Sequence, residues 1–401
     1  MRRATALLLP ALAFAAALIV AALAQRTPAP ADGLAPRDTN APLACSPSFT
    51  VAITFTNGAN WTFCWEMRTK EGVVYRDGRY APPGGAPIHI FAQLGLAQIF
   101  VPYDTGSPRL HDISDFGMGP TSVVLDAADC PGGSLLSDGL KLVVCQQVVG
   151  HGLRQINNSD SSQKEALVMW SSSQIGAYNY IPQWMFHDDG TIEPTIGASG
   201  KLQYVDTNSN FAAFGWPLGG GRFGRSHVHT IYYRLDFDIG PAGNDVVEQY
   251  EFGGSGGFLR RIFSTTLTTE TAAQFSAERF RFWRVVDPTA TNADGHPISY
   301  EISPRVGYAH RVIAEPWTQN DVYVTEYAVD EICATHNGSN CGGSGSDVSG
   351  FVNGQTVHDP VVWVGVTFHH VPRDEDEVVM PMHWESFRLY PRDLTAVNPM
   401  P

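Results

Sequence analysis

Residues 227–239, HVHTIYYRLDFDI, place two histidines at the head of a row of apolar side chains. Side chains on a β-strand alternate between its two faces, so one face carries His227, His229, Ile231, Tyr233, Leu235, Phe237 and Ile239. The opposite face carries Val228, Thr230, Tyr232, Arg234, Asp236 and Asp238. The first face needs a core to cover it. Its two imidazoles, at positions i and i+2, can converge on one ion at the edge of that core.

A His-x-His pair alone is weak evidence, because two hydrogen-bonded core histidines explain it equally well. A third candidate ligand lies in residues 361–370, VVWVGVTFHH, which also predict a strand. There His370 shares a face with Val362, Val364, Val366 and Phe368, and so it also ends an apolar row. Three neutral imidazoles suit copper or zinc, so we predict a metal site at His227, His229 and His370.

Acidic residues on the opposite face of the first strand suggest a second metal. Asp236 and Asp238, together with Asp359 before the second strand, could form a hard-oxygen site for calcium. Main-chain carbonyls, such as those of Phe237 and Pro360, would complete that site. The alternative is a solvated acidic face that binds nothing.

From Cys45 onward, short runs rich in Val, Ile, Tyr and Phe alternate with clusters of Gly, Asn and Asp. This pattern predicts an all-β fold with few helices, in which two large antiparallel sheets pack face to face as a β-sandwich. One hairpin is well marked, because residues 178–186 lead into Asp188-Asp189-Gly190 and the chain resumes at Thr191.

The N-terminal residues indicate export. Arg2 and Arg3 precede a long apolar run that ends in small residues, so residues 1–24 are predicted to be a signal peptide. Residues 25–44 are a Pro- and Ala-rich spacer, and residues 45–401 form the folded domain. We therefore expect a secreted or periplasmic protein. The alternative is an uncleaved membrane anchor, which is the only way we expect the chain to meet a membrane.

The six cysteines form no Cys-x-x-Cys pair, and an exported protein meets an oxidising environment, so they predict disulfides. Sequential pairing gives Cys45–Cys64, Cys130–Cys145 and Cys333–Cys341, although sequence alone does not fix the connectivity. The formal net charge of -14 argues against a nucleic-acid partner and favours cationic ones, including amines.

Several blocks in the same order resemble the catalytic domain of the copper amine oxidases, the topaquinone enzymes, over about residues 61–401. The metal blocks are SHVHTIYYRLDFD at 226–238 with NDVVE at 244–248, and VVW at 361–363 with HVPR at 370–373 and VMP at 379–381. Two others are IGAYNY at 175–180 with DGTI at 189–192, and VPY at 101–103 with DISDFGMG at 112–119. Cys130 and Cys145 fall where the family places a disulfide.

The resemblance implies a function for these blocks. It implies that copper and oxygen convert Tyr178 to topaquinone, that Tyr103 hydrogen-bonds this quinone, and that Asp112 removes a proton from the substrate's α-carbon. The implied reaction is oxidative deamination of primary amines by molecular oxygen, giving aldehyde, ammonia and hydrogen peroxide. Because the family is usually dimeric, the resemblance also implies a homodimer.

The chain departs from the family pattern near the cofactor. Ala177 replaces an asparagine that helps to orient the quinone, Asn179 replaces an acid, and Leu110 replaces an aromatic gate. We expect a less firmly held cofactor and an unusually open site. Two alternatives are a non-catalytic copper-binding β-domain descended from an oxidase, and a zinc hydrolase that uses the three histidines and a metal-activated water.

Overall fold

The computed structural model describes residues 45–241, 243–254, 259–304, 309–337, 341 and 347–399. Contacts between Cα atoms separate residues 1–35 from residues 36–401, and every described residue belongs to the second unit. The predicted signal peptide and spacer lie outside the described residues, so their boundaries stay predictions. Among the described residues, no helix has both the length and the apolar character needed to cross a membrane.

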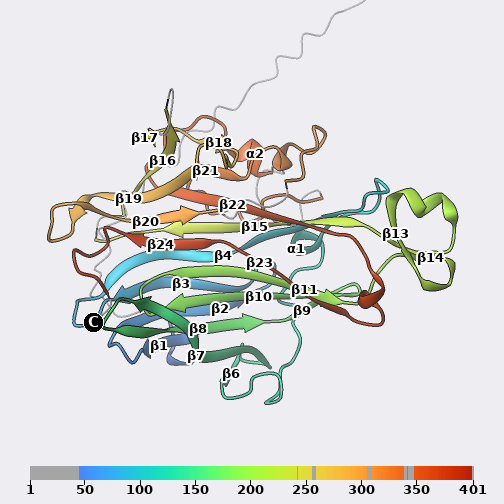
Figure 1. Cartoon of the computed structure of the whole chain (residues 1–401), viewed down its shortest axis with the longest axis horizontal. Coiled ribbons are helices and arrows are strands. Elements are labelled where there is room, and N and C mark those ends of the chain that lie inside the picture. The colour runs from blue at the N-terminus through green and yellow to red at the C-terminus, as the bar shows by residue number, and fades with distance from the viewer. Residues whose placement is uncertain are drawn as a thin grey trace, which may run out of the picture. The chain divides into compact units, whose positions relative to one another are not determined.

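The first sheet has nine strands in the antiparallel order β1-β2-β3-β4-β15-β22-β21-β18, with β5 beside β4 (Figure 1). These strands are β1 Thr50–Thr54, β2 Asn60–Arg68, β3 Gly72–Ala81, β4 Ile88–Pro102, β5 Arg109–His111, β15 His227–Phe237, β18 Thr271–Ala273, β21 Val322–Glu326 and β22 Pro360–His370. Both predicted histidine strands are therefore present, as β15 and β22, and they are direct neighbours.

The second sheet has twelve strands in the antiparallel order β17-β16-β19-β20-β24-β11-β10-β8-β7-β6, with β23 beside β11 and β9 beside β10. They are β6 Ser134–Ser137, β7 Leu142–Ile156, β8 Ser161–Ser171, β9 Ser173–Ile175, β10 Tyr178–His187, β11 Ile192–Gly200, β16 Val246–Gly253, β17 Arg261–Leu267, β19 Phe282–Thr291, β20 Pro297–Ser303, β23 Met380–Ser386 and β24 Arg388–Arg392. The predicted hairpin is the β10–β11 pair, and Gly190 supplies a positive φ of 87° in its turn.

Small elements complete the chain. A three-stranded sheet contains β12 Val205–Asp206, β14 Arg222–Arg225 and β13 Gly215–Leu218. The short helices are α1 Asp112–Asp115, α2 Val348–Phe351, η1 Pro47–Phe49, η2 Ser209–Phe214, η3 Gly219–Gly221, η4 Pro316–Thr318 and η5 Asp374–Asp376. Strands thus dominate the described residues, which confirms the predicted all-β class.

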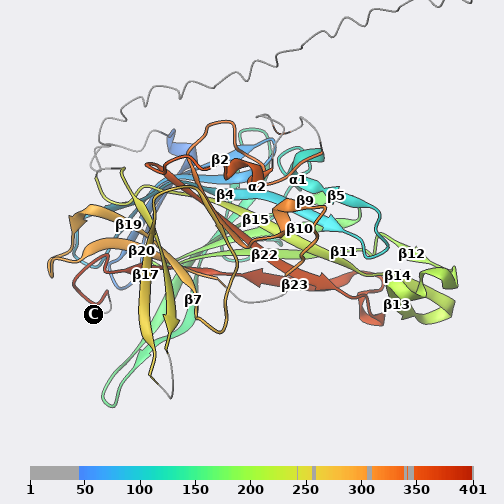
Figure 2. The same ribbon diagram turned by 90° about the horizontal axis from the view of Figure 1, so that it is seen from above.

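The main core lies between the two large sheets, which form separate layers in Figure 2. From the first sheet, Tyr233 on β15 lies edge-on to Trp184 on β10, with ring centroids 5.7 Å apart. The ring of Phe63 on β2 packs against the ring of Phe186 on β10, with centroids 4.5 Å apart. Burying aromatic rings from both sheets supplies the apolar contact area that holds a β-sandwich together.

The second face of β15 is also covered, so every residue of this strand is buried. Tyr232 packs in a smaller buried cluster with Trp363, Tyr323 and Phe351, which come from β22, β21 and α2. Asp236 and Asp238 on this face are only 5% and 7% exposed. The alternative of a solvated acidic face is therefore wrong, because distant segments cover a surface that the local pattern left open.

Three disulfides join the cysteine pairs that sequential pairing gives: Cys45–Cys64, Cys130–Cys145 and Cys333–Cys341. The first ties the N-terminal end of the described chain to β2. The second closes a loop at the edge of the second sheet, where it packs with Leu125.

Candidate active site

The pairing of β15 with β22 brings the three predicted metal ligands together. In this register His227 lies opposite His370, and His229 lies opposite Phe368. His227, His229 and His370 each contribute one ring nitrogen, and these three nitrogens lie within 4.8 Å of one another. His227 and His229 are 1% and 0% exposed, so the group lies at the buried end of the sandwich core.

Hydrogen bonds on the far side of two rings decide which nitrogen faces the group. His227 Nδ1 lies 3.1 Å from the carbonyl oxygen of Arg225, and His370 Nε2 lies 3.0 Å from Asp376 Oδ2. Both partners accept hydrogen bonds, so these nitrogens carry the protons. The lone pairs of His227 Nε2 and His370 Nδ1 are then left facing each other, with the two atoms 3.4 Å apart.

His229 presents the third lone pair. Its Nδ1 lies 3.4 Å from the hydroxyl of Tyr180, while its Nε2 is buried and has no hydrogen-bond partner among the described residues. Burial, assisted by the neighbouring imidazoles, lowers the pKa of His229 well below its usual value and that of His227 to about 3. Neutral imidazole is the form that binds metals, so a copper or zinc ion fits this site and would satisfy the unpaired nitrogen.

Tyr178 lies directly beside this group. Its hydroxyl is 2.7 Å from His227 Nε2 and 3.0 Å from His370 Nδ1. Tyr178 is the first residue of β10, and its backbone pairs with Ile175 on β9 and Gly200 on β11. The strand ladder thus holds the backbone of Tyr178 where its buried phenol ring reaches the candidate metal site.

Asp112, the first residue of α1, supplies a buried carboxyl group near this ring. Its Oδ2 accepts a hydrogen bond of 2.9 Å from the hydroxyl of Tyr180, and its Oδ1 has no hydrogen-bond partner among the described residues. Burial raises the pKa of Asp112 to about 7; the Tyr180 hydrogen bond opposes this shift and the charge of Asp115 adds to it. A carboxyl group with this pKa can accept or donate a proton near neutral pH.

A cavity of about 50 Å³ connects these groups. It is lined by Val101, Tyr103, Leu110, Asp112, Phe116, Ile175, Gly176, Tyr178, Tyr180 and Gln203. The ring of Tyr103 stacks on the ring of His227, with centroids 4.5 Å apart. The structure therefore brings all the predicted catalytic and copper-binding residues into one site. The cavity is small, and the unusually open site expected from Leu110 stays a prediction.

Three residues of this site had no role in the sequence analysis. Asp376 and Tyr180 set the orientation of two histidines, and Gln203 lines the cavity. Gln203 Oε1 accepts a 3.1 Å hydrogen bond from the backbone N–H of Ala177, the residue before Tyr178. The alternation of β10 gave one available signal, since it places Tyr180 on the same face as Tyr178.

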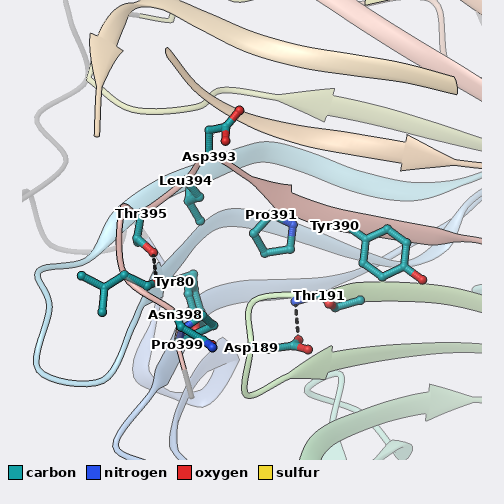
Figure 3. Close-up of a pocket in the computed structure, with 11 residues that line it drawn as sticks. Tyr80, Asp189, Thr191, Tyr390, Pro391, Asp393, Leu394, Thr395, Asn398 and Pro399 are labelled. Carbon is teal, nitrogen blue, oxygen red and sulfur yellow. Dashed lines mark hydrogen bonds between the residues drawn. The ribbon is translucent and has the colours of Figure 1, made fainter. Parts of the chain in front are cut away.

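A larger pocket lies elsewhere, at the β10–β11 turn and the C-terminal segment (Figure 3). Its volume is about 270 Å³, and its lining includes Tyr80, Thr191 and Pro391. Asp189 is on its wall, where Oδ1 accepts a 3.0 Å hydrogen bond from the backbone N–H of Thr191. None of the residues that line it is a histidine or cysteine, so size alone does not make it the candidate active site.

Of the predicted calcium ligands, Asp236 and Asp238 are buried and Asp359 is half-buried, and their side chains do not form a convergent group. Among the described residues, two groups of three His, Cys, Asp or Glu side chains bring their ligand atoms within 4.8 Å, and neither contains Asp236, Asp238 or Asp359. Asp236 Oδ2 lies 3.4 Å from Arg234 Nη1, and Asp238 Oδ2 lies 3.5 Å from His89 Nδ1. The calcium site therefore stays a prediction.

Comparison with known proteins identifies one family. The family model described as "Copper amine oxidase, enzyme domain" matches residues 147–401. A primary amine oxidase of Klebsiella aerogenes is 24% identical over 91% of this chain and 56% of its own length. The copper-containing amine oxidase gamma 1 of Arabidopsis thaliana is 26% identical over 85% of this chain and 56% of its own length. The chain thus spans about half the length of these curated relatives.

Solved structures show the same fold. A copper-containing benzylamine oxidase from Hansenula polymorpha has a TM-score of 0.74 at 18% identity, covering 90% of this chain and 64% of its own. The amine oxidase of Aspergillus nidulans has a TM-score of 0.73 at 22% identity, covering 91% of this chain and 55% of its own.

Metal binding at the three histidines can be tested with a neighbouring control. We expect His229→Ala to abolish stoichiometric copper binding, because it removes one of the three nitrogens that face the ion. Asp376→Asn should weaken copper binding roughly 10–100-fold, the usual effect of losing an outer partner of a histidine ligand. His369→Ala should bind copper normally, since His369 Nε2 pairs instead with Asp104 Oδ2 at 2.8 Å. Equal copper content in His229→Ala and the parent, measured after gel filtration, would contradict this assignment.

Proposed function

Because this chain belongs to the copper amine oxidase family, we propose that it oxidises primary amines with molecular oxygen to aldehyde, ammonia and hydrogen peroxide. The observation that carries the proposal is the position of Tyr178. Its hydroxyl lies within hydrogen-bond distance of two candidate ligand nitrogens, and its ring lines the same cavity as Asp112. A metal site alone would not require a tyrosine and a carboxyl group at these places.

Copper held by His227, His229 and His370 would supply, with oxygen, the redox chemistry needed to convert Tyr178 to topaquinone, an electrophilic carbonyl that no standard side chain offers. The chain's own residues provide the setting for this chemistry. The β9–β10–β11 ladder fixes the backbone of Tyr178, and Gln203 holds the N–H of the preceding residue. Tyr103 packs against His227 and closes one wall of the cavity.

Asp112 is suited to take a proton from the α-carbon of an amine in this cavity. Its Oδ1 is buried without a hydrogen-bond partner among the described residues, and Tyr180 fixes the other oxygen. The lining of Val101, Leu110, Phe116 and Ile175 limits the water that could compete for this carboxylate. With a pKa of about 7, Asp112 is partly ionised at neutral pH and still binds a proton well enough to drive its removal from carbon.

Oxidation of Tyr178 is the direct test of the proposed function. After the purified protein is reconstituted with copper in air, we expect quinone absorbance, a phenylhydrazine adduct and a mass change at Tyr178. Tyr178→Phe should bind copper but show none of these signals. Tyr300→Phe removes a different buried hydroxyl, on β20, and should show them all.

An unmodified Tyr178 in the copper-loaded parent protein would overturn the proposal. Copper binding without any turnover would then indicate a non-catalytic binding domain. Metal-dependent hydrolysis without a quinone would indicate the zinc hydrolase.

The pKa of Asp112 predicts how activity depends on pH. We expect kcat/KM, expressed per unit of unprotonated amine, to rise with pH and level off above about 7, because only the carboxylate accepts the proton. Asp112→Asn should lower kcat/KM by about 10²–10⁴-fold while the quinone still forms. Asp115→Asn, on the same helix, should stay active with its midpoint at lower pH, since it removes a negative charge that raises the pKa of Asp112. A pH profile that is flat between 5 and about 9 in the parent protein would rule out this role.

We also propose calcium binding near Asp236, Asp238 and Asp359. Burial raises the pKa of the adjacent Asp245 well above its usual value, and the charges of Asp238, Asp287 and Asp359 add to this effect. A divalent cation would offset such a concentration of buried carboxylates. Metal analysis of protein purified with calcium, before and after dialysis against a chelator, tests this proposal, and a lack of calcium in both samples contradicts it.

We further propose that the protein acts outside the cytoplasm, and the three disulfides support this location. The homodimer stays a prediction from the family.

A further inference from the structure

A second group of potential metal ligands lies on three strands of the second sheet. Ligand atoms of His151 on β7, His187 on β10 and Glu193 on β11 all lie within 4.8 Å of one another. None of these residues lines the cavity beside Tyr178. This second group therefore has no part in the proposed amine oxidation.

The strand register explains why these three side chains meet. Ala166 on β8 lies between the outer strands, because it pairs with His187 on β10 and with Val149 on β7. His151 follows Val149 by two residues, where the β7–β8 register shifts between Gly150 and Leu153, and its ring lies against that of His187. Ala166 has no side chain beyond Cβ to separate the two rings, whose centroids are 4.9 Å apart. Glu193 pairs with Met185, which makes it the diagonal neighbour of His187 on that face.

His187 is the unusual member of the group. It is 1% exposed, and neither ring nitrogen has a hydrogen-bond partner among the described residues. Its nearest carboxylate contact is 3.7 Å, from Nε2 to Glu193 Oε2. Buried polar groups are normally paired, and a buried histidine that faces another histidine and a carboxylate has the surroundings of a metal ligand.

The position on β10 separates this group from the copper site. Tyr178 opens the strand and faces the core, whereas His187 ends it and projects from the opposite face, together with Met185. Nine residue-to-residue steps separate them along the strand, a span of ~30 Å at about 3.3 Å per residue. Each site can therefore be changed without touching the other.

We propose that His151, His187 and Glu193 bind a zinc-class divalent cation, which ties β7 to the β10–β11 hairpin. Two imidazoles and one carboxylate form an established ligand set for Zn²⁺, with water in the fourth position. Each ligand comes from a different strand, so the ion would cross-link the edge region of the second sheet. This inference does not depend on the proposed oxidase activity.

The charges around the group are compatible with a cation. Burial lowers the pKa of His187, which keeps its ring neutral. Burial would raise the pKa of Glu193, but the His187 ring, Arg388 and Ser386 outweigh it and lower that pKa to about 2. Arg388 Nε lies 3.1 Å from Glu193 Oε2, and a carboxylate oxygen has two lone-pair directions, so Oε2 can bind both. The nearby Lys164 is paired with Asp189 at 2.8 Å.

The test is a zinc titration of the full-length protein after its three-histidine site has been filled with copper. We expect one zinc per chain in addition to copper, and a melting temperature that rises with zinc. His151 is exposed, so His151→Ala should fold normally and lose both responses. The matched control is His358→Ala, because the side chain of His358 is 76% exposed and lies outside the group. That variant should keep both responses.

A second arm separates this site from the copper site. His229→Ala should still take up one zinc per chain, and His151→Ala should still take up one copper. Zinc uptake that is equal in His151→Ala and the parent, or no zinc beyond copper in the parent, would overturn the proposal. Loss of zinc in His229→Ala would also overturn it, since zinc would then be using the copper site.

Discussion

The whole candidate site depends on one strand that is buried on both faces. β15 lies between β4 and β22, and none of its eleven residues is exposed. Its inner face packs on the sandwich core. The first residue pair between β15 and β22 places His227 opposite His370. A one-residue slip in this pairing would move every side chain of β15 to the other face. The geometry of the metal site is therefore fixed by the same contacts that stabilise the fold.

Hydrogen bonds to the outer ring nitrogens of the histidines determine which nitrogen of each ring faces the candidate metal position. A backbone carbonyl, a tyrosine hydroxyl and a carboxylate each contact the far nitrogen of one ring, so all three lone pairs face inward. Tyr180 contacts a second site residue as well. Its hydroxyl donates to Asp112 and lies near His229, which joins the candidate base to a candidate metal ligand through one side chain. Such shared partners leave little freedom for either group to turn.

Short runs of β-forming residues between turn residues predicted the fold class. Alternation of side chains predicted the inner face of β15 and the three histidines, because a strand's period is local and its buried face is apolar. The parts that were missed depend on segments distant in sequence. Asp376 reaches His370 from the short helix η5, and Gln203 reaches Ala177 from beyond the end of β11. The covering of Asp236 likewise required knowledge of tertiary packing. The catalytic assignments came from resemblance to the family, since a lone Asp112 or Tyr178 carries no such signal.

The backbone of Tyr178 has consequences for any change in its ring. It is hydrogen-bonded into a ladder with strands on both sides, and a side chain at Gly200 opposite would collide with the Ala177 carbonyl oxygen. The main chain is thus locked, and reorientation of the ring reduces to two side-chain torsions, χ1 and χ2. With only these two torsions, and a small cavity around the ring, few ring orientations are accessible. An evolved or engineered chain could tune it by altering wall residues such as Leu110 while leaving the sheet intact.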